Sequence, residues 1–236
     1  MAIEHAPDET GGVLSPQLAE LIKPEHTGII VVDVMDAYFD QNAVLPKLVG
    51  FGTAKLDATA RKIKLFLEAA RRYSPATIVF TRMVERPDAV PSNLAKKMAL
   101  DDTPPLVEEN GAGWNYYLVR PQEGDHEIIK THYNAFKDTD LDEHLREKGV
   151  QSVIVVGGYG SRCVARTADA ASDDYGYHTF VPRDLIANPD TSDKPGQSEQ
   201  IDEIAGFLQG FDIILGYTPP SEAILNTWER SLTIQP

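Results

Sequence analysis

Residues 152–174 read SVIVVGGYGSRCVARTADAASDD, and this stretch decides the fold. It opens with an apolar, β-branched run, which is typical of a strand covered on both faces. Glycines at 157, 158 and 160 then predict a tight turn, because glycine reaches backbone conformations that other residues avoid. The segment from Cys163 onward predicts a helix. A strand, a glycine-rich turn and a helix in this order indicate one unit of an α/β fold.

Other segments repeat the pattern of a short apolar run that is closed by a polar residue or glycine. With residues 152–158 they give six predicted strands, the others being GIIVVDV (28–34), ATIVFTR (76–82), EIIK (127–130), HTFVPRD (178–184) and FDIILG (211–216). Helical patterns lie between several of them, with apolar faces through Leu56, Ala60, Ile63, Leu67 and Ala70, through Leu141 and Leu145 between Thr139 and Gly149, and through Ile201, Ile204 and Leu208. Strands that alternate with helices predict a parallel sheet. We therefore expect an α/β protein with a mainly parallel sheet.

The length of 236 residues favours a single domain over residues 1–236. Within it, residues 1–26 are predicted to form an N-terminal arm. Residues 83–125 are rich in proline, glycine and charge, and they are too long for a plain connector. Insertions of this kind often cover a site, so we expect this one near the active site.

Composition narrows the class of protein. The net charge of −14 argues against a nucleic-acid partner, which needs a positive surface. No apolar run approaches the roughly 18–20 residues of a membrane helix, and the first residues do not resemble a secretory signal. A single cysteine allows no intramolecular disulfide. We therefore expect a cytoplasmic protein that acts on a small molecule without membrane contact.

Three reactive residues follow predicted strands. Asp33 closes the first strand, Lys130 closes EIIK, and Cys163 comes a few residues after SVIVVGG. Ligands of open parallel sheets bind beyond the carboxyl ends of the strands, so these side chains are expected at one edge. A lone cysteine is most often an inert buried residue, and an acid or lysine at a strand end is most often solvated. Three such residues at one edge instead indicate a catalytic site.

The position of Cys163 at the start of a helix has a chemical consequence. Unpaired N–H groups and the helix dipole favour a thiolate there, so the pKa of Cys163 is expected to fall. The same N–H groups can receive an oxyanion. A phosphate-binding reading of GGYGSR fits less well, because the third glycine of a dinucleotide fingerprint is replaced by Cys163.

The order of strand-Asp, strand-Lys and glycine-rich-turn-Cys resembles the isochorismatase-like, or cysteine hydrolase, superfamily. The resemblance runs from about residue 27 to 216 and is most specific over residues 124–184. It implies Cys163 as the nucleophile, Asp33 as the general base and Lys130 as the group that orients the pair and stabilises charge. It also implies a cis peptide at Gly158–Tyr159 and an oxyanion hole built from Gly158, Tyr159 and Cys163. Members typically have a six-stranded parallel sheet between helix layers, so the resemblance implies a three-layer α/β/α sandwich with a six-stranded, mainly parallel sheet. Many members are dimers or tetramers, so a homo-oligomer is expected.

This sequence departs from the family pattern at some positions and separates the branches at others. Met35 and Ala37 stand where members commonly have polar residues. The segment TRMVERPD holds none of the histidines through which related nicotinamidases bind a metal, so we expect neither metal nor cofactor. A retained cysteine favours acyl chemistry through a covalent intermediate, and so the hydrolysis of a small amide. The TR…RPD segment and the later Gly113-Trp114 resemble those of hydrolases of carbamoyl (ureide) compounds, such as biuret, ureidoacrylate or N-carbamoyl amino acids. The alternatives are isochorismatase-type hydrolysis of a vinyl ether and a catalytically retired binding protein of the same fold.

Side chains around the insertion and the Lys130 strand are candidates for substrate binding. Arg82 ends the second strand and either forms a structural ion pair or holds a substrate carbonyl or carboxylate. Trp114, Tyr133 and Phe136 either pack locally or line an apolar pocket. Arg162 beside Cys163 is either solvated or helps to lower the pKa of the thiol.

Overall fold

The computed structural model describes residues 12–73, 77–84, 96, 106–190 and 203–233. Its strands are β1 (Thr27–Val32), β2 (Thr77–Met83), β3 (His126–Lys130), β4 (Ser152–Gly158), β5 (His178–Phe180) and β6 (Ile186–Ala187). Its helices are α1 (Pro16–Leu21), α2 (Asp36–Phe39), α3 (Val44–Val49), α4 (Ala54–Ala70), α6 (Leu141–Glu147), α7 (Ala165–Asp173), α8 (Glu203–Ile214) and α9 (Ser221–Thr233). Short 3₁₀ turns cover Pro24–His26 and Arg71–Tyr73, and a π-helical turn covers Gly160–Val164.

The six strands form one sheet in the order β3-β2-β1-β4-β5, with β6 paired to the end of β4. Every pairing in the sheet is parallel. The expected six-stranded α/β architecture is therefore confirmed. Because β1 and β4 lie at the centre, the residues that follow them meet at the carboxyl edge of the sheet.

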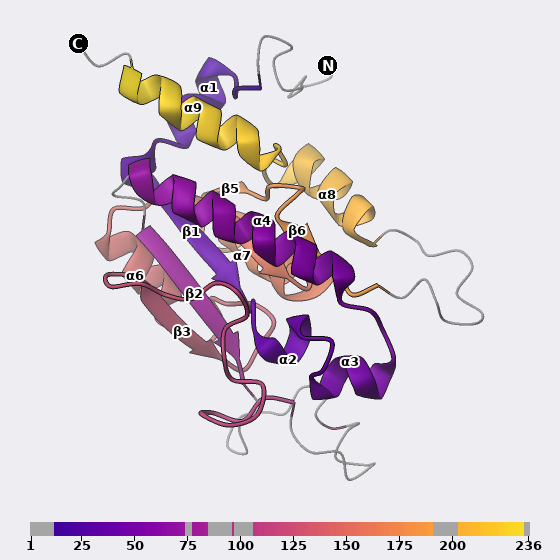
Figure 1. The fold of residues 1–236 in the computed structure, drawn as a ribbon. Helices are drawn as coiled ribbons and strands as arrows, with labels where there is room; N and C mark the ends of the chain where they lie inside the picture. The colour runs from indigo at the N-terminus through magenta and orange to yellow at the C-terminus, as the bar shows by residue number, and fades with distance from the viewer. Residues whose placement is uncertain (1–11, 74–76, 85–95, 97–105, 191–202, 234–236) are drawn as a thin grey trace.

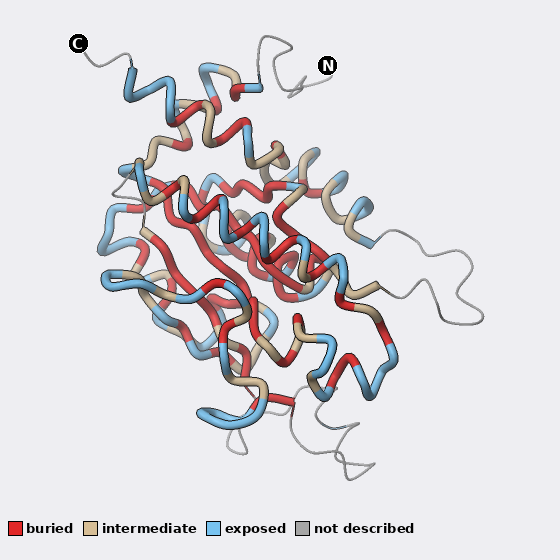
Figure 2. The backbone as a smooth tube through the Cα atoms, viewed as in Figure 1, coloured by how far each residue is buried: buried red, intermediate tan, exposed pale blue. Residues whose placement is uncertain are grey.

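Helices cover both faces of the sheet (Figure 1). One face packs against α1, α4 and α9, and the other packs against α6, α7 and α8. Every residue of β1 and β4 is buried, which explains why these strands are apolar along their whole length. Figure 2 shows this buried layer running through the middle of the molecule.

Helix α4 forms where the apolar spacing predicts it. Leu56, Ala60, Ile63, Leu67 and Ala70 are all buried against the sheet. Helix α6 also agrees, and it ends before Gly149, whose φ of +71° is a left-handed conformation that suits glycine. Its N-cap is Asp140, one residue later than expected.

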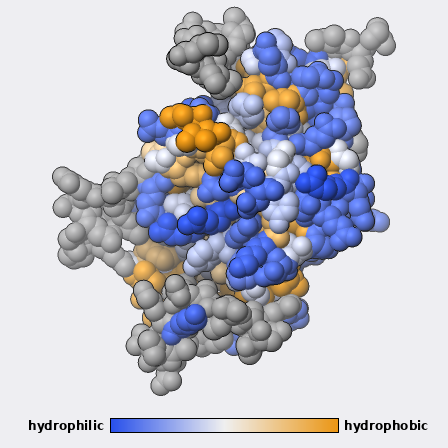
Figure 3. All heavy atoms as spheres, turned by 180° about the vertical axis from the view of Figure 1, so that it is seen from behind, coloured by the Kyte–Doolittle hydropathy of each residue, from blue (hydrophilic) through white to orange (hydrophobic). Residues whose placement is uncertain are grey.

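The prediction of a strand over residues 211–216 is wrong. Residues Glu203–Ile214 form the single helix α8, and the sixth strand is the short β6 instead. A short, mostly apolar run such as FDIILG fits a strand or a helix segment equally well, so periodicity could not decide. Phe211 is the buried residue of α8, whereas Ile213 and Ile214 are 72% and 79% exposed. Figure 3 shows an apolar patch on the side of the molecule where α8 lies.

The described part of the N-terminal arm is bound to the end of the chain. Helix α1 lies beside α9, which the sequence patterns did not reveal (Figure 1). The indole Nε1 of Trp228 donates a hydrogen bond of 2.5 Å to the carbonyl of Ile22, and the amide of Leu14 donates one of 2.9 Å to Thr227 Oγ1. Trp228 is 1% exposed, so this contact anchors both terminal segments on the α4 side of the sheet.

Candidate active site

Asp33 follows the last residue of β1 and is fully buried. Its backbone has a φ of +50°, which turns the chain away from the strand direction. The backbone N–H of Asp33 donates to Thr81 Oγ1 at 3.2 Å, and the Thr81 hydroxyl donates to Asp33 Oδ1 at 2.6 Å. The neighbouring strand β2 therefore holds both the backbone and the carboxylate of Asp33.

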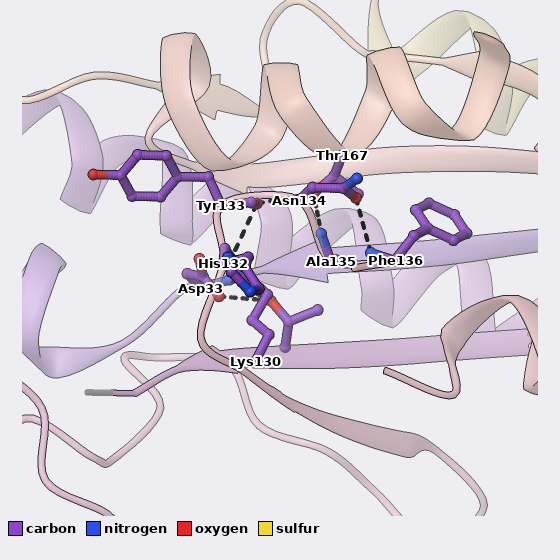
Figure 4. A network of polar contacts seen from close by, with 9 residues as sticks. Asp33, Lys130, His132, Tyr133, Asn134, Ala135, Phe136 and Thr167 are labelled. Atoms are coloured by element: carbon purple, nitrogen blue, oxygen red, sulfur yellow. Dashed lines mark hydrogen bonds and ion pairs between the residues drawn. The ribbon is translucent and has the colours of Figure 1, made fainter. Parts of the chain in front are cut away.

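Lys130 is the last residue of β3, and its side chain is fully excluded from solvent. Its Nζ donates to Asp33 Oδ2 at 2.6 Å, to the carbonyl of His132 at 3.0 Å and to that of Tyr133 at 3.5 Å (Figure 4). These three acceptors match the three protons of an ammonium group. A buried ion pair is tolerated when its remaining hydrogen-bonding groups are satisfied, as they are here.

The ammonium form of Lys130 is favoured by its surroundings. Burial is the largest single influence and acts to lower the pKa of this lysine, but the charges and hydrogen bonds of Asp33 and Cys163 together outweigh burial and raise the pKa above its usual value. Lys130 is therefore a fixed positive charge at the edge of the sheet.

Cys163 lies in the π-helical turn that joins β4 to α7, and it is 7% exposed. Its thiol lies close enough to the Asp33 carboxylate and the Lys130 ammonium for both charges to act on its pKa. The three residues that were expected to meet at one edge of the sheet do so. Parallel order brings them together, because β1 pairs with β4 on one side and with β2 on the other.

The expectation that the pKa of Cys163 is lowered is wrong for this arrangement. Burial is the largest influence, and it raises the pKa of the thiol well above its usual value, as does the nearby Asp33 carboxylate. Lys130 and a hydrogen bond from the backbone of Tyr159 act in the opposite direction without prevailing. Sequence position indicated the helix terminus, but it could not indicate how completely the sulfur is buried.

Arg162 does not supply the missing stabilisation of a thiolate. Its guanidinium lies 3.3 Å from Glu203 Oε1 on α8, and both side chains are about half exposed. Ser161 Oγ donates to the same carboxylate at 2.6 Å. Arg162 therefore belongs to a surface ion pair that ties the turn to α8.

The turn before Cys163 has the expected cis peptide bond at Gly158–Tyr159. Among the described residues, the carbonyl of Tyr159 accepts hydrogen bonds from the amides of Arg162 and Val164, but not from the amide of Cys163 between them. Gly157 has a φ of +125°, and a Cβ atom there would lie 2.1 Å from the carbonyl oxygen of Val32. Glycine is therefore required at this position for β4 to lie against the end of β1.

Arg82 and Trp114 lie apart from the trio. Thr81 and Arg82 are consecutive in β2, so their side chains point to opposite faces of the sheet, and Thr81 is the one that faces Asp33. The Arg82 guanidinium pairs with Glu127 at 2.8 Å and lies 4.3 Å from the ring centre of Trp114. The structure thus brings these candidates together with each other, and their role in substrate binding stays a prediction.

Phe136 and Tyr133 lie on the loop that follows Lys130 (Figure 4). Phe136 is buried and stacks on Tyr175, with ring centres 4.5 Å apart. The side chain of Tyr133 is 38% exposed, and the backbone carbonyl of this residue accepts from Lys130. Phe136 therefore serves packing in this structure, while Tyr133 contacts the trio through its backbone.

Sequence reasoning missed the buried threonines beside the trio. Thr81 contacts Asp33. Thr167 on α7 accepts a hydrogen bond of 3.1 Å from the amide of Ala135, which lies in the loop after Lys130. The one sequence signal for Thr81 was its position next to Arg82, at the carboxyl end of β2, where the site was expected. The insertion reaches the site too, because Tyr116 bridges Met35 just after Asp33. Residues 85–95 and 97–105 of the insertion lie outside the described part of the chain.

Two negative findings apply to the described residues alone. There, no group of three or more histidine, cysteine, aspartate or glutamate side chains is placed to hold a metal ion. Nor is any helix in this part of the chain long and apolar enough to cross a membrane.

Known proteins share both the sequence and the fold. The ureidoacrylate amidohydrolase RutB of Rhizobium rhizogenes is 31% identical over 156 residues, which are 61% of this chain and 63% of that protein. The match therefore spans less than two thirds of that relative. The RutB protein of Caulobacter segnis is 31% identical over 176 residues, which cover 68% of this chain and 73% of that protein.

Among solved structures, a cysteine hydrolase from Pseudomonas syringae pv. phaseolicola superposes with a TM-score of 0.73 at 20% identity, over 89% of this chain and 96% of that one. N-carbamoylsarcosine amidase from Thermoplasma acidophilum gives 0.61 at 22% identity, over 83% and 96%. At these low sequence identities, the two superpositions show that the fold is shared. The isochorismatase domain model matches residues 27–209, from β1 into α8. Because that match covers well over half of the sequence, this chain belongs to the isochorismatase family.

Proposed function

We propose that this chain hydrolyses a C–N bond in a small amide or a carbamoyl (ureide) compound through a covalent intermediate on Cys163. The observation that carries the proposal is the meeting of a buried thiol with a carboxylate and an ammonium group that lie 2.6 Å apart and whose charges both act on the sulfur. A thiol with an adjacent base and a third, orienting group is the arrangement of an activated nucleophile. Two RutB relatives, at 31% identity, are ureidoacrylate amidohydrolases, which supports a ureide as substrate.

The first step follows from the raised pKa of Cys163, which keeps the resting thiol protonated. A protonated thiol is a poor nucleophile, so a base is required. Asp33 takes the thiol proton as the sulfur forms its bond to the substrate carbonyl carbon, and the carbonyl π electrons move to oxygen. Lys130 keeps its charge throughout and stabilises the negative charge on the sulfur.

The oxyanion of the resulting tetrahedral intermediate needs hydrogen-bond donors. We assign the backbone amides of Tyr159 and Cys163 to this role, with Gly158 shaping the turn. The Tyr159 backbone lies close enough to the sulfur to favour its charged form, and the Cys163 amide does not bond the Tyr159 carbonyl within the described structure. Such prearranged donors commonly contribute about 10²–10³ in rate each.

The intermediate then collapses. The C–N bond breaks as Asp33 returns its proton to the leaving nitrogen, and ammonia or an amine departs from an acyl or carbamoyl thioester on Cys163. In the second half, Asp33 takes a proton from water as the water oxygen attacks the thioester carbon. The C–S bond breaks, the acid is released, and the thiol proton is restored from Asp33.

An ammonia-release screen tests this function. We expect ureides or short-chain amides to release ammonia with the wild-type protein and to be untouched by Cys163→Ala. A Cys163→Ala protein that is folded and retains substantial activity would remove cysteine catalysis. Efficient cleavage of isochorismate by that variant would instead favour a vinyl-ether hydrolase, since carbon protonation has no use for a thiol nucleophile. A complete lack of turnover on any substrate would favour a retired binding protein.

We further propose that the chain forms a homo-oligomer. The support is the exposed apolar pair Ile213 and Ile214 on α8, on the side where Figure 3 shows an apolar patch. Exposed apolar patches on a soluble surface commonly mark a site of association. Light scattering coupled to size-exclusion chromatography gives the mass directly, and a strictly monomeric protein at working concentration would contradict this part of the proposal.

A further inference from the structure

Two buried threonines lie on either side of the Asp33–Lys130 pair. Thr81 and Thr167 are both 0% exposed, and they come from β2 and α7 respectively. A hydroxyl group that is buried in this way needs hydrogen-bond partners within the protein, because leaving it unpaired costs free energy of folding. The Thr81 hydroxyl hydrogen-bonds to Asp33, and the Thr167 hydroxyl hydrogen-bonds to the loop that follows Lys130.

The hydroxyl of Thr81 makes two bonds to the same residue. It accepts from the Asp33 N–H at 3.2 Å, and it donates its single proton to Asp33 Oδ1 at 2.6 Å. Asp33 Oδ2 is held separately by Lys130 at 2.6 Å. The carboxylate therefore cannot rotate about its Cβ–Cγ bond without breaking one of these two contacts, and the left-handed backbone of Asp33 is held as well.

The hydroxyl of Thr167 acts on the other partner. It accepts from the amide of Ala135 at 3.1 Å and donates to the carbonyl of Tyr133 at 3.4 Å (Figure 4). The Tyr133 carbonyl is also an acceptor for Lys130 Nζ. Thr167 lies four residues after Cys163, one helical turn along. It thus joins the segment that carries the thiol to the loop that cradles the lysine.

We propose that Thr81 and Thr167 are positioning residues, which hold Asp33 and Lys130 in register with Cys163. The inference rests on the proposed function, because it gives Asp33 the role of base. The hydrogen bonds of the two hydroxyls go to Asp33 and to the Lys130 loop and not to the sulfur of Cys163, so each threonine acts through a neighbouring residue. Thr81 should matter more than Thr167, because it bonds the carboxylate itself, whereas Thr167 bonds a backbone carbonyl at a longer distance.

The test compares Thr81→Val, which removes the hydroxyl at nearly constant shape, with Thr81→Ser, which keeps it. Thr81→Ala is a second hydroxyl-free variant in case valine prevents folding. On a substrate found in the ammonia screen, we expect kcat to fall about 10- to 100-fold in the hydroxyl-free variants, the effect of losing one hydrogen bond to a charged group, with KM little changed. Serine should restore most of kcat. For Thr167→Val we expect a fall of about 3- to 10-fold, again restored by serine.

A second readout needs no substrate. Cys163 is the chain's single cysteine, so iodoacetamide alkylation reports on this thiol alone. If Asp33 must be aligned to take the thiol proton, alkylation should slow in Thr81→Val and recover in Thr81→Ser. The matched control is Thr179→Val, because Thr179 is also a fully buried strand threonine but donates to the carbonyl of Tyr177 at 3.1 Å. It should lose stability without changing the alkylation rate or kcat.

The outcomes separate the two proposals. Folded Thr81→Val protein with wild-type kcat and alkylation rate would overturn the positioning role and leave the proposed function intact. Equal losses in Thr81→Val and Thr81→Ser, or in Thr179→Val, would show a packing effect and also overturn it. Activity that survives in Cys163→Ala would overturn the proposed function itself, whatever the threonine variants do.

Discussion

Asp33 and Lys130 are 97 residues apart in the chain, yet Lys130 Nζ lies 2.6 Å from Asp33 Oδ2 with both side chains wholly excluded from solvent. The sheet creates this contact, because β2 lies between the strands that carry them and all three run parallel. Two opposite charges in a water-free place stabilise each other only as a pair. The stability of the fold and the proposed chemistry therefore both depend on the ion pair of Asp33 and Lys130.

Removal of one partner of this pair should be costly. We expect Lys130→Met to destabilise the protein by about 3–5 kcal/mol, because the Asp33 carboxylate is left buried without its counter-charge. Adding Asp33→Asn to Lys130→Met should recover part of the lost stability, since the uncompensated charge is gone. Urea unfolding of both variants measures this. A double variant no more stable than Lys130→Met would show that the two side chains do not act as a pair.

Alkaline pH should weaken the fold through the same pair. Burial acts to lower the pKa of Lys130, but Asp33 and Cys163 together raise it in the folded protein above the value of 10.5 that applies when the lysine is free. A raised folded pKa means that the stabilisation is fully present below about 10.5 and is lost as the pH rises through the folded value. The unfolding free energy should therefore fall above pH 10.5 more steeply than in Lys130→Met. Parallel pH curves for the two proteins would contradict this account.

The contact between β4 and the end of β1 makes Gly157 intolerant of a side chain. A Cβ atom would lie 2.1 Å from the Val32 carbonyl oxygen, and the φ of +125° disfavours any other residue. We expect Gly157→Ala to cost at least about 3 kcal/mol. Gly176→Ala is the control, because Gly176 has a φ of +73° and nothing within 4 Å of the added atom. It should cost about 1–2 kcal/mol, and equal losses in both variants would remove the steric argument.

Chelation should leave the activity unchanged. The proposed mechanism uses a carboxylate, an ammonium group and a thiol, and none of its steps needs a Lewis acid. The measurement is ammonia release before and after exhaustive dialysis against a chelator. Loss of activity that zinc or iron restores would show that the reaction depends on a metal and that the mechanism is incomplete.

The strand ends could be predicted from the sequence, and so could the meeting of Asp33, Lys130 and Cys163 at one edge of the sheet. Parallel strands place their carboxyl ends at one edge, so knowing that Asp33, Lys130 and Cys163 each follow a strand was enough to bring them together. The burial of the site could not be predicted in the same way. The raised pKa of Cys163 depends on how completely distant segments cover the sulfur, and no local pattern carries that information.

Side-chain direction and short, mostly apolar runs are two features that sequence patterns do not resolve. The Arg82 side chain points to the opposite face of the sheet from that of Thr81, since successive side chains of a strand alternate, and its role in substrate binding stays a prediction. Residues 211–216 are mostly apolar, which fits either secondary structure, and the structure shows that the first four of them are the last turn of α8. Thr81 and Thr167 were missed because buried threonines are ordinary in strands and helices, and their partners lie far away in the chain.

Intact-protein mass spectrometry during turnover tests the central claim most directly. With a slow ureide or amide substrate from the screen, the quenched wild-type protein should carry the mass of the acyl or carbamoyl fragment, and peptide mapping should place that fragment on Cys163. The adduct should be absent from Cys163→Ala. Rapid ammonia release with no adduct at any time point, together with undiminished turnover by Cys163→Ala, would contradict the account.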